Sequence, residues 1–551
     1  MLRAAPSRWI VLATLGVVLL VALVLALGPW GRADPAPSAP QPADPADPAE
    51  ALSLTLDRML QRSGVPAAGV VLRPLAAPDA PADTALLAER TCAALADRLA
   101  RLPGLRVGPC RAGAGAAASG LDDTRLARLL AVRHVLHGAI EPGDGDRVNV
   151  RLALHAPATG QVAWQIDQGL ALAELQALPA RVSAAVAAAL GVADLPPPPA
   201  MAPETYARFV RAAAQARRPS IEDRQAAVRL LDEVVAAEPS HLDAVFVRHG
   251  LQGWLLGNDA SGGSGTTVER LNAARAAHVA EGLALAQRLV AADPQDLRGQ
   301  WLLLGHEMEV RQMVQGFARL DALLQRAAQQ PGVLRLAARL HLHAGYVARA
   351  RQLALEAARL NALDAEAHEI LALTAGIERR DAELREFIAI ARQVGHQGMG
   401  RAEVFEAWRR RDWAEVERAH AAWVGWGGQW SSEWVPAWAR ALAEPAGSPA
   451  REAAARMLDG HDAATRQHFV SYFVEYALLG DTARSLKAVQ HHAALPPATW
   501  MQHLWWPEFA EVRRAPGFVE AMEALGFVAL WEARGAPDFC RRADEGRWRC
   551  G

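Results

Sequence analysis

Two His-Glu pairs, beginning at His306 and His368, start the pattern by which one helix binds zinc in metalloproteases. That pattern requires a second histidine on the same helix face, four residues after the first. Val310 and Ala372 occupy this position in the two segments. No glycine-rich dinucleotide fingerprint follows a predicted strand either. The sequence therefore predicts no metal and no cofactor.

A nucleophilic serine is not supported. Ser264 lies in Gly-Gly-Ser-Gly, which lacks the flanking spacing of a nucleophile elbow. Three further histidines are expected on a solvated surface, namely His491, His492 and His503. We therefore predict a protein that is not an enzyme. The alternative, an enzyme with an unfamiliar site, requires titratable groups that converge in a deep pocket.

The chain has four cysteines. Cys540 and Cys550 enclose a short loop, and we expect them to pair, because closing a loop near this size stabilises by roughly 3 kcal/mol in the chain-entropy model. Cys92 and Cys110 could also pair, with a core-facing helix cysteine as the alternative. Neither spacing is the C-x-x-C pattern of redox or zinc sites.

An uncharged run at the N-terminus, Ile10–Leu27, is long enough to cross a bilayer as a helix. Arg3 and Arg8 precede it, which favours an N-terminus inside the cytoplasm. A cleavable signal peptide is the alternative. We predict a bacterial inner-membrane, single-pass protein with most of the chain in the periplasm. Its first segments would be a cytoplasmic stub at 1–8, a transmembrane anchor at 9–30 and a Pro/Ala-rich linker at 31–50.

Residues 51–192 are expected to form a small α+β domain. Apolar and polar residues alternate in Asp146–His155, and again in Gln161–Asp167, where Val162, Trp164 and Ile166 are expected to face inward. This pattern is typical of half-buried strands joined by a hairpin. With the segments upstream, the order β-α-β-α-β-β-β-α contains a three-stranded antiparallel meander. The other expected elements are strands at Ala68–Leu72 and Leu105–Val107 and helices at Thr84–Leu102, Asp122–Val132 and Ala171–Leu190.

The stretch LARLLAVRHVLHGAIEPGDGDRVNVRLALHAPATGQVAWQ resembles the TolB amino-terminal-like domain, with Ala131 where that family usually has glycine. Such domains occur in the periplasmic part of CadC-like membrane proteins. The resemblance covers about 120 residues and implies a binding or docking module without catalytic residues.

A proline-rich linker at 193–203 separates this domain from helical segments at 204–400. A 34-residue period fits 297–330, 331–364 and 365–398 without gaps, and less regular copies precede it. This period resembles the tetratricopeptide repeat, whose stacked helix pairs form a solenoid with a concave binding surface. A plain helical bundle is the alternative.

The resemblance to these repeats implies which side chains of the first helices face the concave side. Mixed arginine, glutamate and tryptophan would suit a peptide partner, whereas ordinary surface or packing roles are the alternative. The candidate partner-binding residues are Phe246, Trp254, Arg298, Trp301, Glu309, Arg335, Arg339, Glu366 and Glu369.

Residues 401–551 are expected to form degenerate helical repeats and a Trp-rich C-terminal cap. Tryptophans at helical spacing favour packing between helices over a ligand cage. The tail resembles the closing segment of proteins that join a TolB-like domain to tetratricopeptide repeats, although we do not expect their cytoplasmic DNA-binding domain in this protein. The tryptophans before this tail are Trp408, Trp413, Trp423, Trp426, Trp430, Trp434 and Trp438.

The charge balance excludes a polycation: 58 Lys+Arg face 60 Asp+Glu, a net charge of -2, so no nucleic-acid partner is expected. Together these features predict a multi-domain, membrane-anchored periplasmic scaffold, non-catalytic, that docks envelope proteins through a helical-repeat groove. The alternative is a sensory module of a CadC-like regulatory system that acts through a separate membrane partner.

Overall fold

The computed structural model describes residues 67–551, except 76–81, 103, 109, 111–121, 145–146, 198–199, 217–219, 259–267, 293, 295–296, 328–329, 395, 397–398, 427–432, 466–471, 495–500 and 544–545. The described residues all belong to one compact unit of the chain. The segments predicted at 1–8, 9–30 and 31–50 lie outside the described residues.

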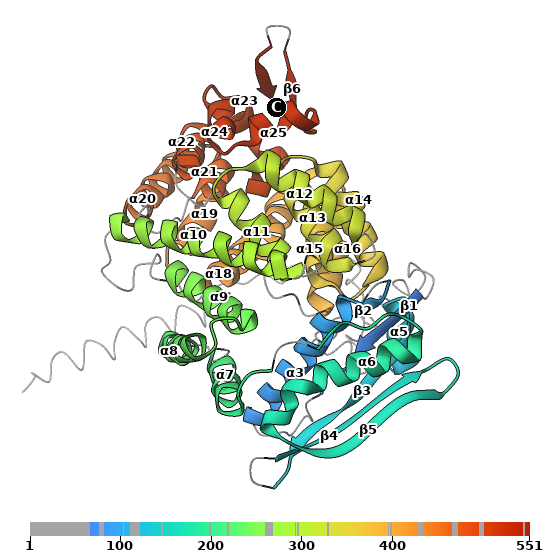
Figure 1. Cartoon of the computed structure of the whole chain (residues 1–551). Coiled ribbons are helices and arrows are strands. Elements are labelled where there is room, and N and C mark those ends of the chain that lie inside the picture. The colour runs from blue at the N-terminus through green and yellow to red at the C-terminus, as the bar shows by residue number, and fades with distance from the viewer. Residues whose placement is uncertain are drawn as a thin grey trace, which may run out of the picture. The chain divides into compact units, whose positions relative to one another are not determined.

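A five-stranded mixed sheet forms the first part of the described chain (Figure 1). Its strand order is β2-β1-β3-β4-β5; β1 runs parallel to β2 and β3, whereas β3, β4 and β5 form an antiparallel meander. The strands are β1 Ala67–Leu72, β2 Arg106–Gly108, β3 Val132–Pro142, β4 Arg147–Ala156 and β5 Gln161–Ala171. The element order matches the one expected, and the two short strands extend the meander into a mixed sheet.

One face of this sheet carries the core. Alternate residues of β4, such as Val150 and Leu154, are buried with α3 (Ala82–Ala100) and α6 (Leu178–Leu190), which follows the 3-10 turn η1 (Leu172–Ala177). Helix α5 (Asp123–Leu129) starts at the N-cap Asp122, whose side chain accepts a hydrogen bond from the Arg125 amide. Val162 at the start of the edge strand β5 is exposed, so its predicted inward orientation is wrong.

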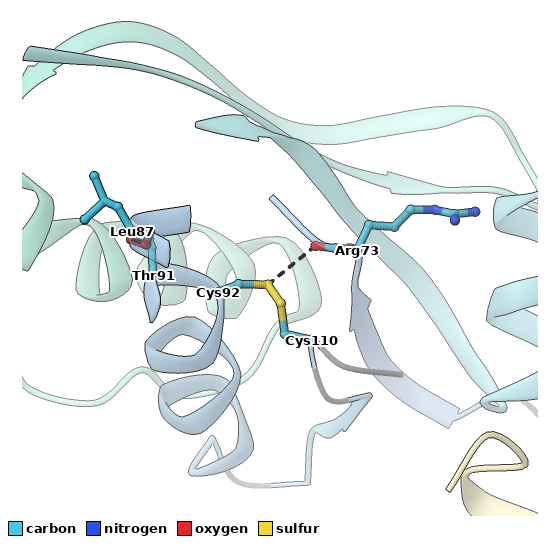
Figure 2. The surroundings of a disulfide bond; sticks show 5 residues. All are labelled: Arg73, Leu87, Thr91, Cys92 and Cys110. Carbon is cyan, nitrogen blue, oxygen red and sulfur yellow. Dashed lines mark hydrogen bonds between the residues drawn. A yellow bond between two sulfur atoms is a disulfide. The ribbon is translucent and has the colours of Figure 1, made fainter. Parts of the chain in front are cut away.

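A disulfide between Cys92 and Cys110 joins α3 to the segment after β2 (Figure 2). The Cys92 sulfur is buried and lies 3.4 Å from the carbonyl oxygen of Arg73, just beyond β1. A second disulfide joins Cys540 and Cys550, which face each other on the short strands β6 (Cys540–Arg542) and β7 (Trp548–Cys550). The structure thus pairs all four cysteines.

Helix pairs make up the middle of the chain. Helix α7 connects these pairs to the sheet domain, because its Tyr206 side chain packs against the core of that domain. These helices are α7 Pro203–Gln215, α8 Ile221–Ala237, α9 Leu242–Asn258, α10 Val268–Ala292, α11 Leu297–Glu309, α12 Met313–Arg326, α13 Pro331–His343, α14 Val347–Leu360, α15 Ala365–Ile377, α16 Asp381–Gln393, α17 Gly400–Arg410 and α18 Trp413–Trp426.

The helix starts repeat at the spacing found in the sequence. Helices α11, α13 and α15 begin at residues 297, 331 and 365, and α12, α14 and α16 begin at 313, 347 and 381. Small residues such as Ala338, Ala350 and Ala357 are fully buried where the paired helices pack. The three consecutive pairs therefore share one internal geometry.

The turn inside each of these pairs uses a left-handed residue at the same position: Arg311 (φ 65°), Gly345 (φ 90°) and Arg379 (φ 57°). Only glycine adopts this conformation without a steric penalty, which is about 1–2 kcal/mol for other residues.

Replacing the exposed Arg379 with glycine is therefore expected to raise the free energy of unfolding by about 0.5–1 kcal/mol, after the larger unfolded-state entropy of glycine is subtracted. Chemical denaturation measures the change. The control is Arg385→Gly within α16, where glycine should instead destabilise by about 0.5–1 kcal/mol. An equal loss of stability in both variants would show that the turn is not strained.

The C-terminal part continues with shorter elements. They are α19 Val435–Leu442, α20 Pro449–Thr465, α21 Phe473–Leu479, α22 Thr482–Ala494, the 3-10 turns η4 Met501–Trp505 and η5 Pro507–Phe509, α23 Ala510–Arg514, α24 Phe518–Ala524 and α25 Phe527–Arg534, before β6 and β7. We name residues 501–551 the C-terminal clasp, because they return to the middle helix pairs.

The clasp bonds to the turn between α13 and α14. The indole N–H groups of Trp505 and Trp531 donate to the carbonyl oxygens of His343 and Ala344, at 3.1 and 3.0 Å. The Asp538 amide donates to the Gly345 carbonyl oxygen at 3.1 Å. These carbonyls end a helix and have no partner inside it, so the clasp satisfies them.

Two neighbouring turns also contact the clasp. The ring of Trp506 covers Gly376, where a Cβ atom would overlap it, and the backbone at Gly526 packs against the Arg311 carbonyl. In Figure 1 the red α25 lies beside α12, and the two helices are in contact. The described part of the clasp therefore packs over the turns of three successive helix pairs, α11–α12, α13–α14 and α15–α16. It does not continue the series of helix pairs.

The predicted transmembrane helix needs correction. In the part of the chain that the structure describes, no helix combines the length and the apolar character needed to cross a membrane. Even α10, with 25 residues, carries Arg275 and Glu281 along its length. The span expected at 10–27 lies outside the described residues. The fold is mostly helical with a small mixed sheet, and the fold class with an N-terminal transmembrane helix and the inner-membrane location are withdrawn.

Candidate functional site

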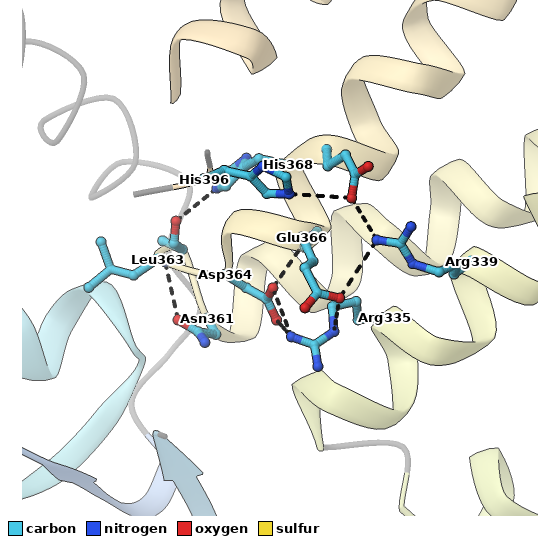
Figure 3. A network of polar contacts seen from close by, with 11 residues as sticks. Arg335, Arg339, Asn361, Leu363, Asp364, Glu366, His368 and His396 are labelled. Carbon is cyan, nitrogen blue, oxygen red and sulfur yellow. Dashed lines mark hydrogen bonds and ion pairs between the residues drawn. The ribbon is translucent and has the colours of Figure 1, made fainter. Parts of the chain in front are cut away.

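Four of the predicted partner-binding residues form one ion-pair network between α13 and α15, together with Asp364 (Figure 3). We name it the Arg–Glu cluster. Its members are Arg335 and Arg339 on α13, Glu366 and Glu369 on α15, and the α15 N-cap Asp364. Arg335 lies 3.2 Å from Asp364 and 3.4 Å from Glu366, and Arg339 lies 2.6 Å from Glu369.

The 34-residue spacing brings two members of the cluster to the same side of the stack. Arg335 and Glu369 occupy the same position in two consecutive first helices, and Trp301 occupies it in the helix before. Equivalent positions of stacked helices lie on one side of the stack. The sequence therefore predicted that these residues lie on one side of the stack. It did not predict that the arginines and glutamates pair with one another.

Electrostatics keep the buried end of the cluster charged. Burial alone would raise the pKa of Glu369, but Arg339 and the His396 ring 3.4 Å away outweigh it and lower that pKa to about 2. For Arg335, burial would lower the pKa, and the nearby Asp364 and Glu366 raise it overall. The Glu366 side chain stays 51% exposed. The cluster thus presents preformed charges of both signs.

The other predicted partner-binding residues are not part of this cluster. Phe246 packs against a small core that includes Leu285, and the Trp254 ring lies under the Arg224 guanidinium at 3.5 Å. Trp301 is 44% exposed. The side chains of Arg298 and Glu309 on α11 lie outside the described part of the structure.

The His-Glu pair at His306 makes contacts inside the helical stack. His306 lies 3.2 Å from His249, nitrogen to nitrogen, and Glu307 pairs with Arg319. The His278 ring stacks on His249 at 3.8 Å. Burial, together with the neighbouring His278 and His306, lowers the pKa of His249 to about 3, so this ring is neutral near pH 7.

A buried charge lies among the C-terminal tryptophans. Glu475 on α21 accepts a hydrogen bond at 2.9 Å from the ring nitrogen of His420 on α18, and both side chains are buried. The Arg401 guanidinium is 3.9 Å from Glu475 and lies over the Trp423 ring. Trp434 and Trp438 pack against the edge of His420. Sequence reasoning missed this group, because its members come from separate helices.

A third group was also missed. Among the described residues, Asp123, His137 and His155 are the one set of three ligand-type side chains close enough to hold a metal ion. They lie on α5, β3 and β4, and the register of the sheet brings them together. No local motif links them, so the spacing in the sequence did not reveal them.

No protein-family model matches the chain, and no curated protein matches it either. The fold and the clusters therefore define the class of protein only broadly: a helical-pair protein with a small mixed-sheet domain. The resemblances to the TolB-like domain and to tetratricopeptide repeats stay predictions from the sequence.

Proposed function

We propose that the protein is a non-catalytic scaffold that binds a protein partner on the side of the helix stack that carries Trp301 and the Arg–Glu cluster. The observation that carries the proposal is the alignment of Trp301, Arg335 and Glu369 at equivalent positions of α11, α13 and α15. Tryptophan and arginine side chains are enriched in protein interfaces, and this side of the stack carries both.

The internal pairing of the cluster supports binding of a polar peptide surface. Because Arg339 and Glu369 already hold one another, their side chains lose little further conformational entropy when a partner binds. The exposed Glu366 carboxylate, beside the two arginines, offers both an acceptor and a charge pattern. A partner with alternating basic and acidic side chains and one apolar pocket for Trp301 fits this surface.

The test identifies the partner by crosslinking in intact cells and then measures its affinity for purified variants. Trp301→Ala is expected to weaken binding by about 30-fold, since buried tryptophan anchors contribute about 2 kcal/mol or more. The matched control is Leu355→Ala, because Leu355 is equally exposed (45%) but lies on the second helix α14. Its affinity should stay at the wild-type value.

Two results would contradict the proposal. One is an unchanged affinity of Trp301→Ala for the crosslinked partner. The other is a crosslinking experiment in which the protein captures small molecules but no protein partner.

A further inference from the structure

Asp123, His137 and His155 converge on the face of the sheet that α5 covers. Cross-strand pairing places Val135 opposite His155, and His137 follows two residues later, so both histidines lie on the same face of β3 and β4. Asp123 enters from the first turn of α5. The core helices α3 and α6 pack on the other face, with Leu136 and Leu154.

The distances around the Asp123 carboxylate fit metal ligands. Its Oδ2 atom lies 3.0 Å from Nε2 of His155 and 3.3 Å from Nδ1 of His137. Bonds of about 2.0–2.1 Å to one zinc ion place neighbouring tetrahedral ligands about 3.3 Å apart. The ligand atoms all lie within 4.8 Å of one another, and the two rings are 4.5 Å apart. One ion can therefore bridge them after small side-chain rotations.

The surroundings suit such a site. Nε of Arg73 donates to the other carboxylate oxygen, Oδ1, at 2.6 Å, which fixes the carboxylate and leaves Oδ2 toward the histidines. His137 is 43% exposed, so an ion can enter from solvent.

We propose that Asp123, His137 and His155 bind one divalent transition-metal ion of the zinc type. Two imidazole nitrogens and one carboxylate oxygen are a ligand set that such ions take, and water or a partner side chain can complete the coordination. The site is independent of the partner surface proposed above, because it lies on the sheet domain.

The test titrates Zn²⁺ into the purified full chain after chelator treatment and removal, and follows the binding by calorimetry. The wild type should bind one Zn²⁺ at this site. His137→Ala and the near-isosteric Asp123→Asn should each lose this binding. The control His241→Ala removes a histidine at the start of α9 and should leave the binding unchanged. Circular dichroism verifies that each variant is folded.

His249 on α9 and His306 on α11, which contact each other, are the alternative place for a metal ion, and a variant of His249 distinguishes the two sites. If the metal were held by His249 and His306, then His249→Ala would abolish Zn²⁺ binding and Asp123→Asn would retain it. That result overturns the proposal, as does a wild-type chain with no saturable Zn²⁺ binding. Loss in Asp123→Asn with retention in His249→Ala supports it.

Discussion

Replacing Trp505 with alanine is expected to lower the free energy of unfolding by about 3–5 kcal/mol, the cost of removing a large buried aromatic side chain. Trp505 is fully buried and packs against Gly345, where even a Cβ atom would lie 2.9 Å from its ring. Its indole also donates to the His343 carbonyl, which would lose its partner. Denaturant unfolding measures the loss.

The control for this prediction is Trp301→Ala, which removes the same side chain from an exposed position. Surface substitutions usually change stability by less than about 0.5 kcal/mol, so Trp301→Ala should stay close to the wild type. Gly345→Ala should destabilise as Trp505→Ala does, because it both clashes with this ring and strains the turn. If Trp505→Ala unfolds at the same denaturant concentration as Trp301→Ala, the clasp does not stabilise the helix pairs.

Replacing Glu475 with alanine is expected to cost about 3–5 kcal/mol, since it leaves buried polar groups without their charged partner. His420 would lose its hydrogen bond, and Arg401 would lose the one acidic group whose charge acts on it in the described structure. Denaturation at pH 7 measures the loss. The control is Glu415→Ala, which breaks an exposed pair with Arg418 and should cost less than about 1 kcal/mol.

Glu475 also makes the free energy of unfolding depend on pH. Burial alone would raise the pKa of Glu475, but the hydrogen bond from His420 and the charge of Arg401 outweigh it, and the net pKa is lowered. A group with a lowered folded-state pKa stabilises the fold above its unfolded value, near 4.3, and this contribution is lost as the pH falls through the folded value. The free energy of unfolding of the wild type should therefore decrease as the pH drops below about 4. That of Glu475→Gln should decrease less over the same pH range. Parallel curves for the two proteins would contradict this assignment.

The sequence predicts the local elements well. Alternation in β4 and the 34-residue period of α11 to α16 follow from side-chain direction, so strands and helix starts can be read from spacing. Val162 is the exception, because the register of β4 and β5 shifts between Leu154 and His155, so Val162 lies opposite His155 and not on the face that carries Leu154. Local spacing is thus a reliable guide within an element and a weaker one at its end.

Contacts between distant segments could not be predicted in this way. The tryptophan content indicates that rings are buried, but not that Trp505 meets a turn 162 residues earlier. Likewise, Asp123 meets His155 only through the register of β3 and β4. The Arg–Glu cluster is an intermediate case: the period aligns Arg335 with Glu369, but the pairing of Arg339 with Glu369 depends on side-chain geometry.

The clasp has a consequence for synthesis on the ribosome. Ordinary helical repeats depend only on their neighbours, so they can fold one after another as they emerge. Here the bonds from Trp531 and Arg534 reach back 187 and 213 residues. The turns of the α11 to α16 pairs therefore stay uncovered until residues 501–551 have been synthesised, and a nascent chain halted before residue 501 should depend on chaperones.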